Sequence, residues 1–203
     1  DKRIIFLDDA DHERFISLLY LCNNGIPIHR SDHRTQVLDK IFLVEREATL
    51  VDIGAYCLMP NHFHILLREH TDGGVSMFMQ KLLTAYAMYF NKKYGRKGTL
   101  FEGPFRSRHV ASDEYLKYLF AYIHLNPLGI IDSGWKKKRI QDKKTASQYL
   151  DEYAYSSFLD YSLGGSPRKQ SAILNKLAFP VYFEKNRDFN AYLKDWMSGA
   201  DVI

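Results

Sequence analysis

The sequence is poor in cysteine and has no long apolar run. Its 203 residues include two cysteines, Cys22 and Cys57, which are too few for a disulfide scaffold and are spaced unlike a zinc ribbon. This usage fits a reducing cytosol, so we expect a cytoplasmic protein. No stretch approaches the roughly 20 apolar residues of a membrane span, and the run at residues 4–7 is too short for the core of a signal peptide. We therefore expect no membrane partner.

Neither sign of charge dominates. Lys and Arg total 28 against 24 Asp and Glu, a net charge of +4 that permits an anionic partner without requiring one. Hydrophobic residues make up 46% and charged residues 26%, which is the mix of a folded protein rather than a disordered one. The length favours one domain with an appendage, which we place at residues 1–130 and 131–203.

Helical periodicity covers four segments of the chain. Apolar residues recur every three to four positions, and the predicted helices are residues 10–22, 75–94, 112–126 and 189–197. Ser112 is expected to cap the third helix, which stops before Pro127. Residues 25–34 are expected to form a loop, and the extension after residue 130 is expected to be mostly helical.

Strand patterns lie between these helices. Two runs rich in apolar and β-branched residues, 49–59 and 62–67, flank the turn-forming pair Pro60 and Asn61 and predict an antiparallel hairpin. Alternation at residues 105–110 predicts a further, half-buried strand. Helices and strands in this order indicate an α+β fold.

One short segment carries two histidines in strand register. His62 and His64 lie two residues apart in the second predicted strand, so both imidazoles project from one face while Phe63 and Ile65 project from the other. Two imidazoles aligned in this way can bind one metal ion. With 8 histidines in the chain, a pair at this spacing arises by chance in roughly a quarter of such sequences, so a structural role stays open.

A polar stripe on the third predicted helix is a candidate partner for these histidines. Tyr118, Tyr122 and Asn126 recur every four residues and share one side of the helix, opposite an apolar side. A phenol one turn before a carboxamide can place one oxygen near a phosphate and the other near a metal ion. With 14 tyrosines in the chain, packing against the core is the alternative and the more common role.

Three segments in a fixed order make the chain resemble a known family. They are MPNHFH at residues 59–64, GTLFEGPFRSR at 98–108 and YIHLNPL at 122–128. Together they are similar to the single-tyrosine transposases of the His-hydrophobic-His superfamily, of the insertion-sequence type and the REP-associated tyrosine transposases. An aromatic-Ser-Ser segment at residues 153–158 also resembles the family, and the similarity spans roughly residues 1–165.

The resemblance implies a ferredoxin-like antiparallel sheet with helices packed on it, and metal-dependent cleavage and strand transfer of single-stranded DNA through a 5′-phosphotyrosine intermediate. By position, His62, His64 and Asn126 correspond to metal ligands and Tyr122 to the nucleophile, with Mg²⁺ or Mn²⁺ as the ion. The expected partner is single-stranded or hairpin DNA, and the cytoplasmic protein is expected to join the nucleoid when it binds DNA. Tyr122 acts either within its own subunit or across a homodimer, and the sequence leaves both open.

The chain also departs from the family. The strand that precedes the first helix in family members is not visible, and since the sequence starts at Asp1 rather than methionine, we expect that upstream residues are missing. The span between residues 23 and 49 looks longer than usual. Family members often have Gln or Glu in place of Asn126, a difference that bears on metal affinity.

Basic residues near these motifs are candidate DNA contacts. Six of them, at the end of the second predicted helix and in the predicted strand that follows, are Lys92, Lys93, Arg96, Lys97, Arg106 and Arg108. Phe101 and Phe105 lie between them and can stack on bases. For the four at the helix end, a favourable interaction with the helix dipole is the alternative. A further basic run at residues 136–139 is more ambiguous, because solvated basic runs are common.

Two other functions stay open at this point. One is a catalytically silent DNA-hairpin or single-strand binding protein derived from a transposase. The other is an unrelated metallohydrolase in which Tyr122 only packs. The combination of His62, His64, Tyr122 and Asn126 favours the transposase, because a pure binding protein has no chemical need for all four.

Overall fold

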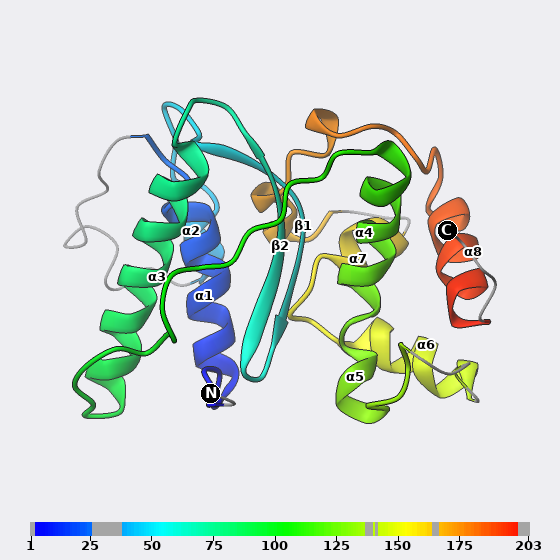
Figure 1. Ribbon diagram of the computed structural model, residues 1–203, viewed down its shortest axis with the longest axis horizontal. Coiled ribbons are helices and arrows are strands. Elements are labelled where there is room, and N and C mark those ends of the chain that lie inside the picture. Colours follow the sequence, from blue (N-terminus) through cyan, green and yellow to red (C-terminus); the bar gives the residue numbers. More distant parts are fainter. Residues whose placement is uncertain (1–2, 26–37, 137–139, 141, 164–166, 199–203) are drawn as a thin grey trace.

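The computed structural model describes residues 3–25, 38–136, 140, 142–163 and 167–198 (Figure 1). Its helices and strands, in chain order, are α1 (Asp9–Leu21), α2 (Leu38–Ile41), β1 (Val51–Met59), β2 (His62–Glu69), α3 (Gly74–Lys93), α4 (Asp113–Leu125), α5 (Leu128–Ile131), α6 (Lys143–Glu152), α7 (Phe158–Ser162), the 3-10 helices η2 (Lys169–Ile173) and η3 (Lys176–Ala178), and α8 (Asn186–Met197). None of these helices is both long and apolar enough to cross a membrane. Apart from Gly25, the predicted loop at 25–34 lies outside the described residues.

The predicted hairpin is confirmed. β1 and β2 pair antiparallel, with Met59 opposite His62 across the turn at Pro60 and Asn61. Helices cover the hairpin on both sides, α1 and α3 on one and α4 with the later helices on the other (Figure 1). This is an α+β arrangement with helices packed on an antiparallel sheet, as the sequence predicts.

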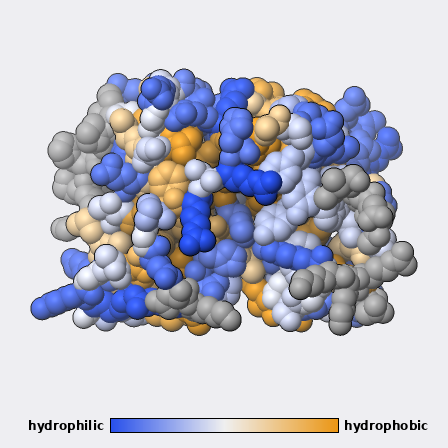
Figure 2. All heavy atoms as spheres, in the orientation of Figure 1, coloured by the Kyte–Doolittle hydropathy of each residue, from blue (hydrophilic) through white to orange (hydrophobic). Residues whose placement is uncertain are grey.

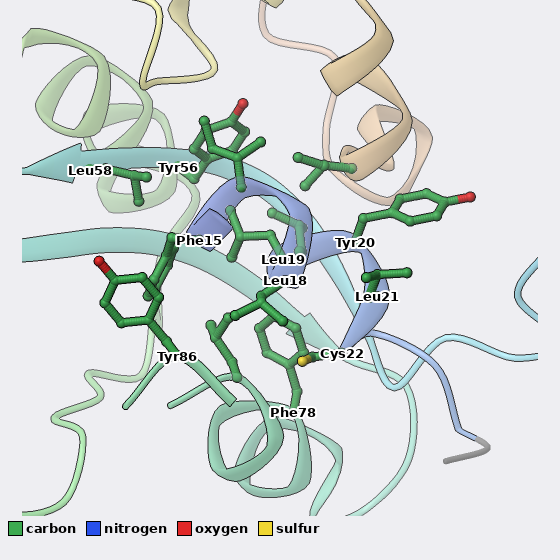
Figure 3. Packing of buried hydrophobic residues seen from close by; sticks show 14 of the residues in the cluster. Phe15, Leu18, Leu19, Tyr20, Leu21, Cys22, Tyr56, Leu58, Phe78 and Tyr86 are labelled. Atoms are coloured by element: carbon green, nitrogen blue, oxygen red, sulfur yellow. The ribbon is translucent and has the colours of Figure 1, made fainter. Parts of the chain in front are cut away.

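β1 is the central strand of the described fold, and all nine of its residues are buried. Tyr56 and Leu58 point into the core shared with α1 and α3 (Figure 3). Cys57 and Met59 point the opposite way, into a cluster with residues of α4. The edge of β1 that does not pair with β2 forms backbone hydrogen bonds with residues 155–157. Ser157 N, for example, donates to Tyr56 O at 2.9 Å. β2 therefore lies at the edge of the described sheet, and all of its side chains except Leu66 are exposed or half-buried.

The predicted helices agree with the structure to within a few residues. α1 and α3 each begin and end one residue from the predicted bounds, and α8 begins three residues early. Ser112 caps α4 as expected, since its Oγ accepts a hydrogen bond from Tyr115 N at 3.2 Å. Gly95 follows α3 with a φ of 61°, a left-handed conformation that glycine adopts without strain.

The strand predicted at residues 105–110 is wrong. This stretch is extended but has no ladder partner, so the described residues form a sheet of two strands only. A strand needs a neighbour to pair its N–H and C=O groups. One edge of β1 is already taken by residues 155–157, and a groove separates residues 105–110 from β2.

The mostly helical extension is confirmed, and it packs directly on α4. Ala121 and Leu125 of α4 share a buried cluster with Trp135, Phe158 and Phe189. The division into residues 1–130 and 131–203 stays a prediction.

Candidate active site

β2 presents His62 and His64 on one face, as the two-residue strand period predicts. Their rings meet edge to face, with centroids 4.9 Å apart. Phe63 and Ile65 pack instead on the core shared with α1 and α3. The apolar side of β2 therefore fixes the strand and leaves both imidazoles on the side of α4.

Tyr122 of α4 meets this pair. Its ring centroid lies 5.4 Å from that of His64, with the two planes at 81°. Tyr118, one turn earlier, tilts against Tyr122 at 5.7 Å and contacts Trp196 of α8 at 5.0 Å. The helix stripe thus brings Tyr122 to the histidines, while Tyr118 packs toward α8.

Both imidazoles are held in the neutral form. Burial, then the neighbouring His62, then the charge of Lys136 lower the pKa of His64 to about 4. Desolvation by the surrounding protein, followed by the Lys136 charge, lowers the pKa of His62 as well. A neutral imidazole has one nitrogen lone pair free, which is the form that binds metal ions.

The hydrogen bonds of the two histidines leave a nitrogen open on each. His62 Nδ1 lies 2.8 Å from Asn61 Oδ1, and since that oxygen accepts, Nδ1 donates and Nε2 keeps its lone pair. His64 Nε2 is buried and has no hydrogen-bond partner among the described residues. A buried nitrogen without a partner is unfavourable unless something binds it. The pair therefore fits a bound cation.

Asn126 lies at the C-terminal end of α4 and is buried, with 2% of its surface exposed. Its Nδ2 donates to the Tyr122 carbonyl oxygen at 2.7 Å, so the side chain is tied to the helix that carries the phenol. This bond uses the amide nitrogen and not the oxygen that a metal would take. Among the described residues, three or more His, Cys, Asp or Glu side chains nowhere form a metal-binding group. The two imidazoles are the ligands that the structure brings together, and the role of Asn126 as a ligand stays a prediction.

Lys136, which the sequence placed only in an ambiguous basic run, also reaches this site. Its Nζ donates to Tyr122 Oη at 2.8 Å and lies 4.4 Å from the centre of the Tyr122 ring. The remaining residues of that run, 137–139, lie outside the described residues. No sequence spacing links Lys136 to Tyr122, because the chain turns back between them.

A groove of about 1320 Å³ opens beside Tyr122 and His64. Residues 63–69 of β2 form one wall, the extended residues 105–112 form the other, and α4 contributes Tyr115 and Tyr122. Arg106 and Arg108 are exposed along this extended wall, and the Arg108 guanidinium lies 4.7 Å from the centre of the Tyr115 ring. Figure 2 shows hydrophilic side chains gathered along the middle of this face of the molecule. The groove joins two of the predicted DNA contacts to the site.

The other four predicted DNA contacts lie at the end of α3, away from the residues that line the groove. Lys93 is held within the molecule, with Nζ 2.7 Å from Asp8 and 2.8 Å from the fully buried Asp11. Arg96 lies over the Phe90 ring, and Lys92 and Lys97 are exposed. Their part in DNA binding stays a prediction.

Sequence reasoning also missed the role of His124 and Ser157, which lie inside two of the quoted motifs. His124 is fully buried, its Nδ1 donates to the Phe120 carbonyl at 2.7 Å, and its Nε2 accepts from Ser157 Oγ at 2.7 Å. Ser157 Oγ in turn accepts from Tyr56 N at 2.9 Å. These bonds hold α4 against β1, so they set the distance between Tyr122 and the hairpin.

Comparison with protein families identifies the class of protein. Residues 22–126, more than half of the chain, match the family described as Transposase IS200 like. The chain belongs to this family and is therefore a transposase, an enzyme that acts on DNA in transposition. The matched range includes the hairpin, α3 and α4, and ends at Asn126. The REP-associated subgroup stays a prediction. Comparison with curated proteins gave no match, and comparison with solved structures gave none.

Proposed function

We propose that this transposase cleaves and joins single-stranded DNA through a covalent link to Tyr122, with a divalent cation bound by His62 and His64. The observation that carries the proposal is the contact between Tyr122 and His64, whose buried Nε2 has no hydrogen-bond partner among the described residues. A phenol beside two neutral imidazoles places a nucleophile next to a cation site. Since both groups belong to one chain, the contact supports an active site within a single subunit.

His62 Nε2 and His64 Nε2 would hold the cation, with the Asn126 amide oxygen and water as oxygen ligands. Nitrogen and oxygen donors together suit Mn²⁺ or Mg²⁺ better than metals that prefer thiolates. When bound, the cation polarises a nonbridging phosphate oxygen and so makes the phosphorus more electrophilic.

Tyr122 supplies the nucleophile. Its Oη forms a bond to phosphorus while the bond from phosphorus to the 3′ oxygen breaks. The phenol proton passes to solvent, and the departing 3′ oxygen takes up a proton and becomes a free hydroxyl. The 5′ side of the strand stays on Tyr122 as a phosphotyrosine. Attack by a 3′ hydroxyl on that phosphotyrosine joins a strand and restores the phenol, so no external energy source is needed.

The groove provides a path for the strand. Arg106 and Arg108 would contact phosphates, while Phe105 and Tyr115 offer aromatic faces on which bases can stack. A strand that follows the groove passes His64 and Tyr122, because both line it.

The test is the covalent adduct itself. The protein is incubated with a panel of single-stranded hairpin oligonucleotides and Mn²⁺, and protein-linked DNA is counted on a denaturing gel. Tyr122→Phe keeps the ring and removes the only atom that bonds to phosphorus, so we expect normal DNA binding and no adduct. Tyr118→Phe is the matched control on the same helix stripe and should still form the adduct.

Two results would contradict the proposal. Adduct formation by the Tyr122→Phe protein would show that the nucleophile is another residue. Tight hairpin binding by the unaltered protein, with no adduct or nick in any divalent metal, would favour the catalytically silent binding protein.

A further inference from the structure

Lys136 is a cation that lies outside the range matched to the transposase family yet touches the reacting oxygen. The family match ends at residue 126, ten positions before it. Its Nζ donates to Tyr122 Oη at 2.8 Å and lies 4.4 Å from the ring centre. No carboxylate contacts Lys136 in the part of the chain that the structure describes. Its positive charge is therefore directed at the phenol.

The fold fixes the backbone that carries this lysine. After α5 the chain turns at Asp132, whose Oδ1 accepts from Gly134 N at 2.8 Å. Trp135 then inserts into the core that α4 shares with the extension, and only 9% of its surface stays exposed. A side chain at Gly129 would lie 3.2 Å from Trp135 Nε1, so the indole packs closely on α5. Lys136, the next residue, is thereby placed beside α4.

We propose that Lys136 is a catalytic residue of the proposed strand-transfer reaction. It holds Tyr122 Oη in place and stabilises the negative charge that this oxygen carries. In cleavage, Oη gains charge as the phenol proton leaves to solvent, and it loses that charge as it bonds to phosphorus. In joining, the bond from Oη to phosphorus breaks and the same charge returns to Oη, which then recovers a proton from solvent. Lys136 keeps its own protons in both directions.

This role predicts which steps depend on the lysine. A fixed positive group beside a developing oxyanion favours the transition state more than the bound substrate. Because Lys136 is exposed to solvent, we expect its removal to slow the chemical step by about 10- to 100-fold, below the ~10²–10³ of a buried oxyanion donor. Cleavage and joining should both slow, since Oη carries developing negative charge in each direction.

The experiment compares Lys136→Met, which keeps the length of the side chain, with Lys136→Arg, which keeps the charge. Lys117→Met is the matched control, because Lys117, like Lys136, lies over a tyrosine ring, with its Nζ 5.0 Å from the centre of the Tyr192 ring. DNA is bound first, and Mn²⁺ then starts a single turnover whose adduct is counted over time. The Kd of each variant is measured by anisotropy without metal.

We expect Lys136→Met to bind hairpin DNA within about twofold of the unaltered chain and to form adduct 10- to 100-fold more slowly. Lys136→Arg should recover most of the rate, which a purely packing role does not predict, and Lys117→Met should match the unaltered chain. A second readout needs neither DNA nor metal. Acetylation of Tyr122 by N-acetylimidazole, measured by mass spectrometry against Tyr118 in the same molecule, should fall in Lys136→Met and not in Lys117→Met.

Each contrary result has a separate meaning. Lys136→Met at the full rate, with unchanged acetylation, would overturn the role of Lys136 alone. A raised Kd and a lower salt dependence with a normal rate on bound DNA would make Lys136 a phosphate contact and also overturn its chemical role. If the unaltered chain forms no adduct, the proposed function fails and the role of Lys136 in it fails too.

Discussion

At the scale of single residues, the site keeps two imidazoles uncharged next to a lysine. His64 is the more constrained of the two, because burial, His62 and Lys136 all disfavour its protonated form. The same surroundings leave its Nε2 without a partner among the described residues. A buried nitrogen without a partner is unfavourable, so His64 lowers the stability of the fold unless a ligand binds it.

The first prediction concerns this histidine and the metal. His64→Ala removes one imidazole ligand, so we expect at least 10-fold weaker adduct formation at a fixed Mn²⁺ concentration and a higher Mn²⁺ concentration for half-maximal rate. Adduct gels over a Mn²⁺ series measure both. His70→Ala is the control, since His70 pairs with Asp52 at 2.7 Å at the other end of β2. Equal Mn²⁺ curves for His64→Ala and the unaltered chain would remove His64 from the metal site.

At the scale of elements, the extended segment after α3 forms one wall of a groove instead of a third strand. Its unpaired backbone leaves Arg106 and Arg108 exposed to the groove opposite β2. The segment is therefore suited to a nucleic-acid strand, whose phosphates are contacted by exposed cations.

The second prediction tests this wall. Arg106→Ala and Arg108→Ala should each weaken DNA binding and lower the magnitude of the slope of log K against log salt by about one. Each variant makes one phosphate contact fewer, so its binding releases fewer counterions from the DNA. Anisotropy titrations between 50 and 200 mM salt, roughly the range over which such slopes are resolved, measure it. Lys97→Ala, from the end of α3, is measured in parallel. An unchanged slope for both arginine variants would assign them to packing, and a lowered slope for Lys97→Ala would add the α3 cluster to the DNA surface.

The third prediction concerns the bond between α4 and the segment after α6. Burial lowers the pKa of His124 to about 4, so the folded chain disfavours the proton that the unfolded chain takes up near pH 6.5. Stability is then complete above pH 6.5 and falls as the pH approaches 4. We expect the unfolding free energy to drop about 3 kcal/mol more from pH 7 to pH 4 than in His124→Gln.

Urea unfolding at several pH values measures this difference. Ser157→Ala is the control, because it removes the hydroxyl that bonds to His124 Nε2 and leaves the titrating ring in place. It should lower stability at every pH while keeping most of the pH dependence. Parallel curves for His124→Gln and the unaltered chain would show that the folded state does not lower the pKa of His124.

At the scale of the whole molecule, two cores share one strand. β1 is buried on both faces, with Tyr56 in the core of α1 and α3 and Cys57 in the cluster with α4. Residues 155–157 form backbone hydrogen bonds with the edge of β1 that does not pair with β2. The extension is therefore joined to the hairpin through backbone bonds as well as through side chains.

The periodicity of apolar residues was enough to predict the hairpin, the long helices and the side of each on which the site residues lie. The strand period aligned His62 with His64, and the helix period placed Tyr122 on one side of α4 with Tyr118 and Asn126, although Asn126 is buried. Strand pairing at residues 105–110 was not predictable in this way, because it depends on whether a neighbour's edge is free. Lys136 was missed for a similar reason, since its contact depends on a turn anchored by the burial of Trp135.

The last prediction asks whether the molecule unfolds as one unit. Its two tryptophans, Trp135 and Trp196, both lie in the extension, whereas its two cysteines, Cys22 and Cys57, are buried in the part before residue 130. Tryptophan fluorescence and thiol labelling therefore report the two parts separately in one urea titration. Because β1 is shared by both cores, we expect the two transitions to coincide.

A pair of core variants makes this test sharper. Phe189 of α8 is 1% exposed in the extension core, and Phe78 of α3 is fully buried in the other core. Phe189→Ala and Phe78→Ala should each lower the unfolding free energy by about 3–5 kcal/mol. If the cores are coupled through β1, each variant shifts the fluorescence and thiol transitions together. A Phe189→Ala protein in which only the tryptophan signal moves would instead show that residues 131–203 unfold independently, as a separate appendage does.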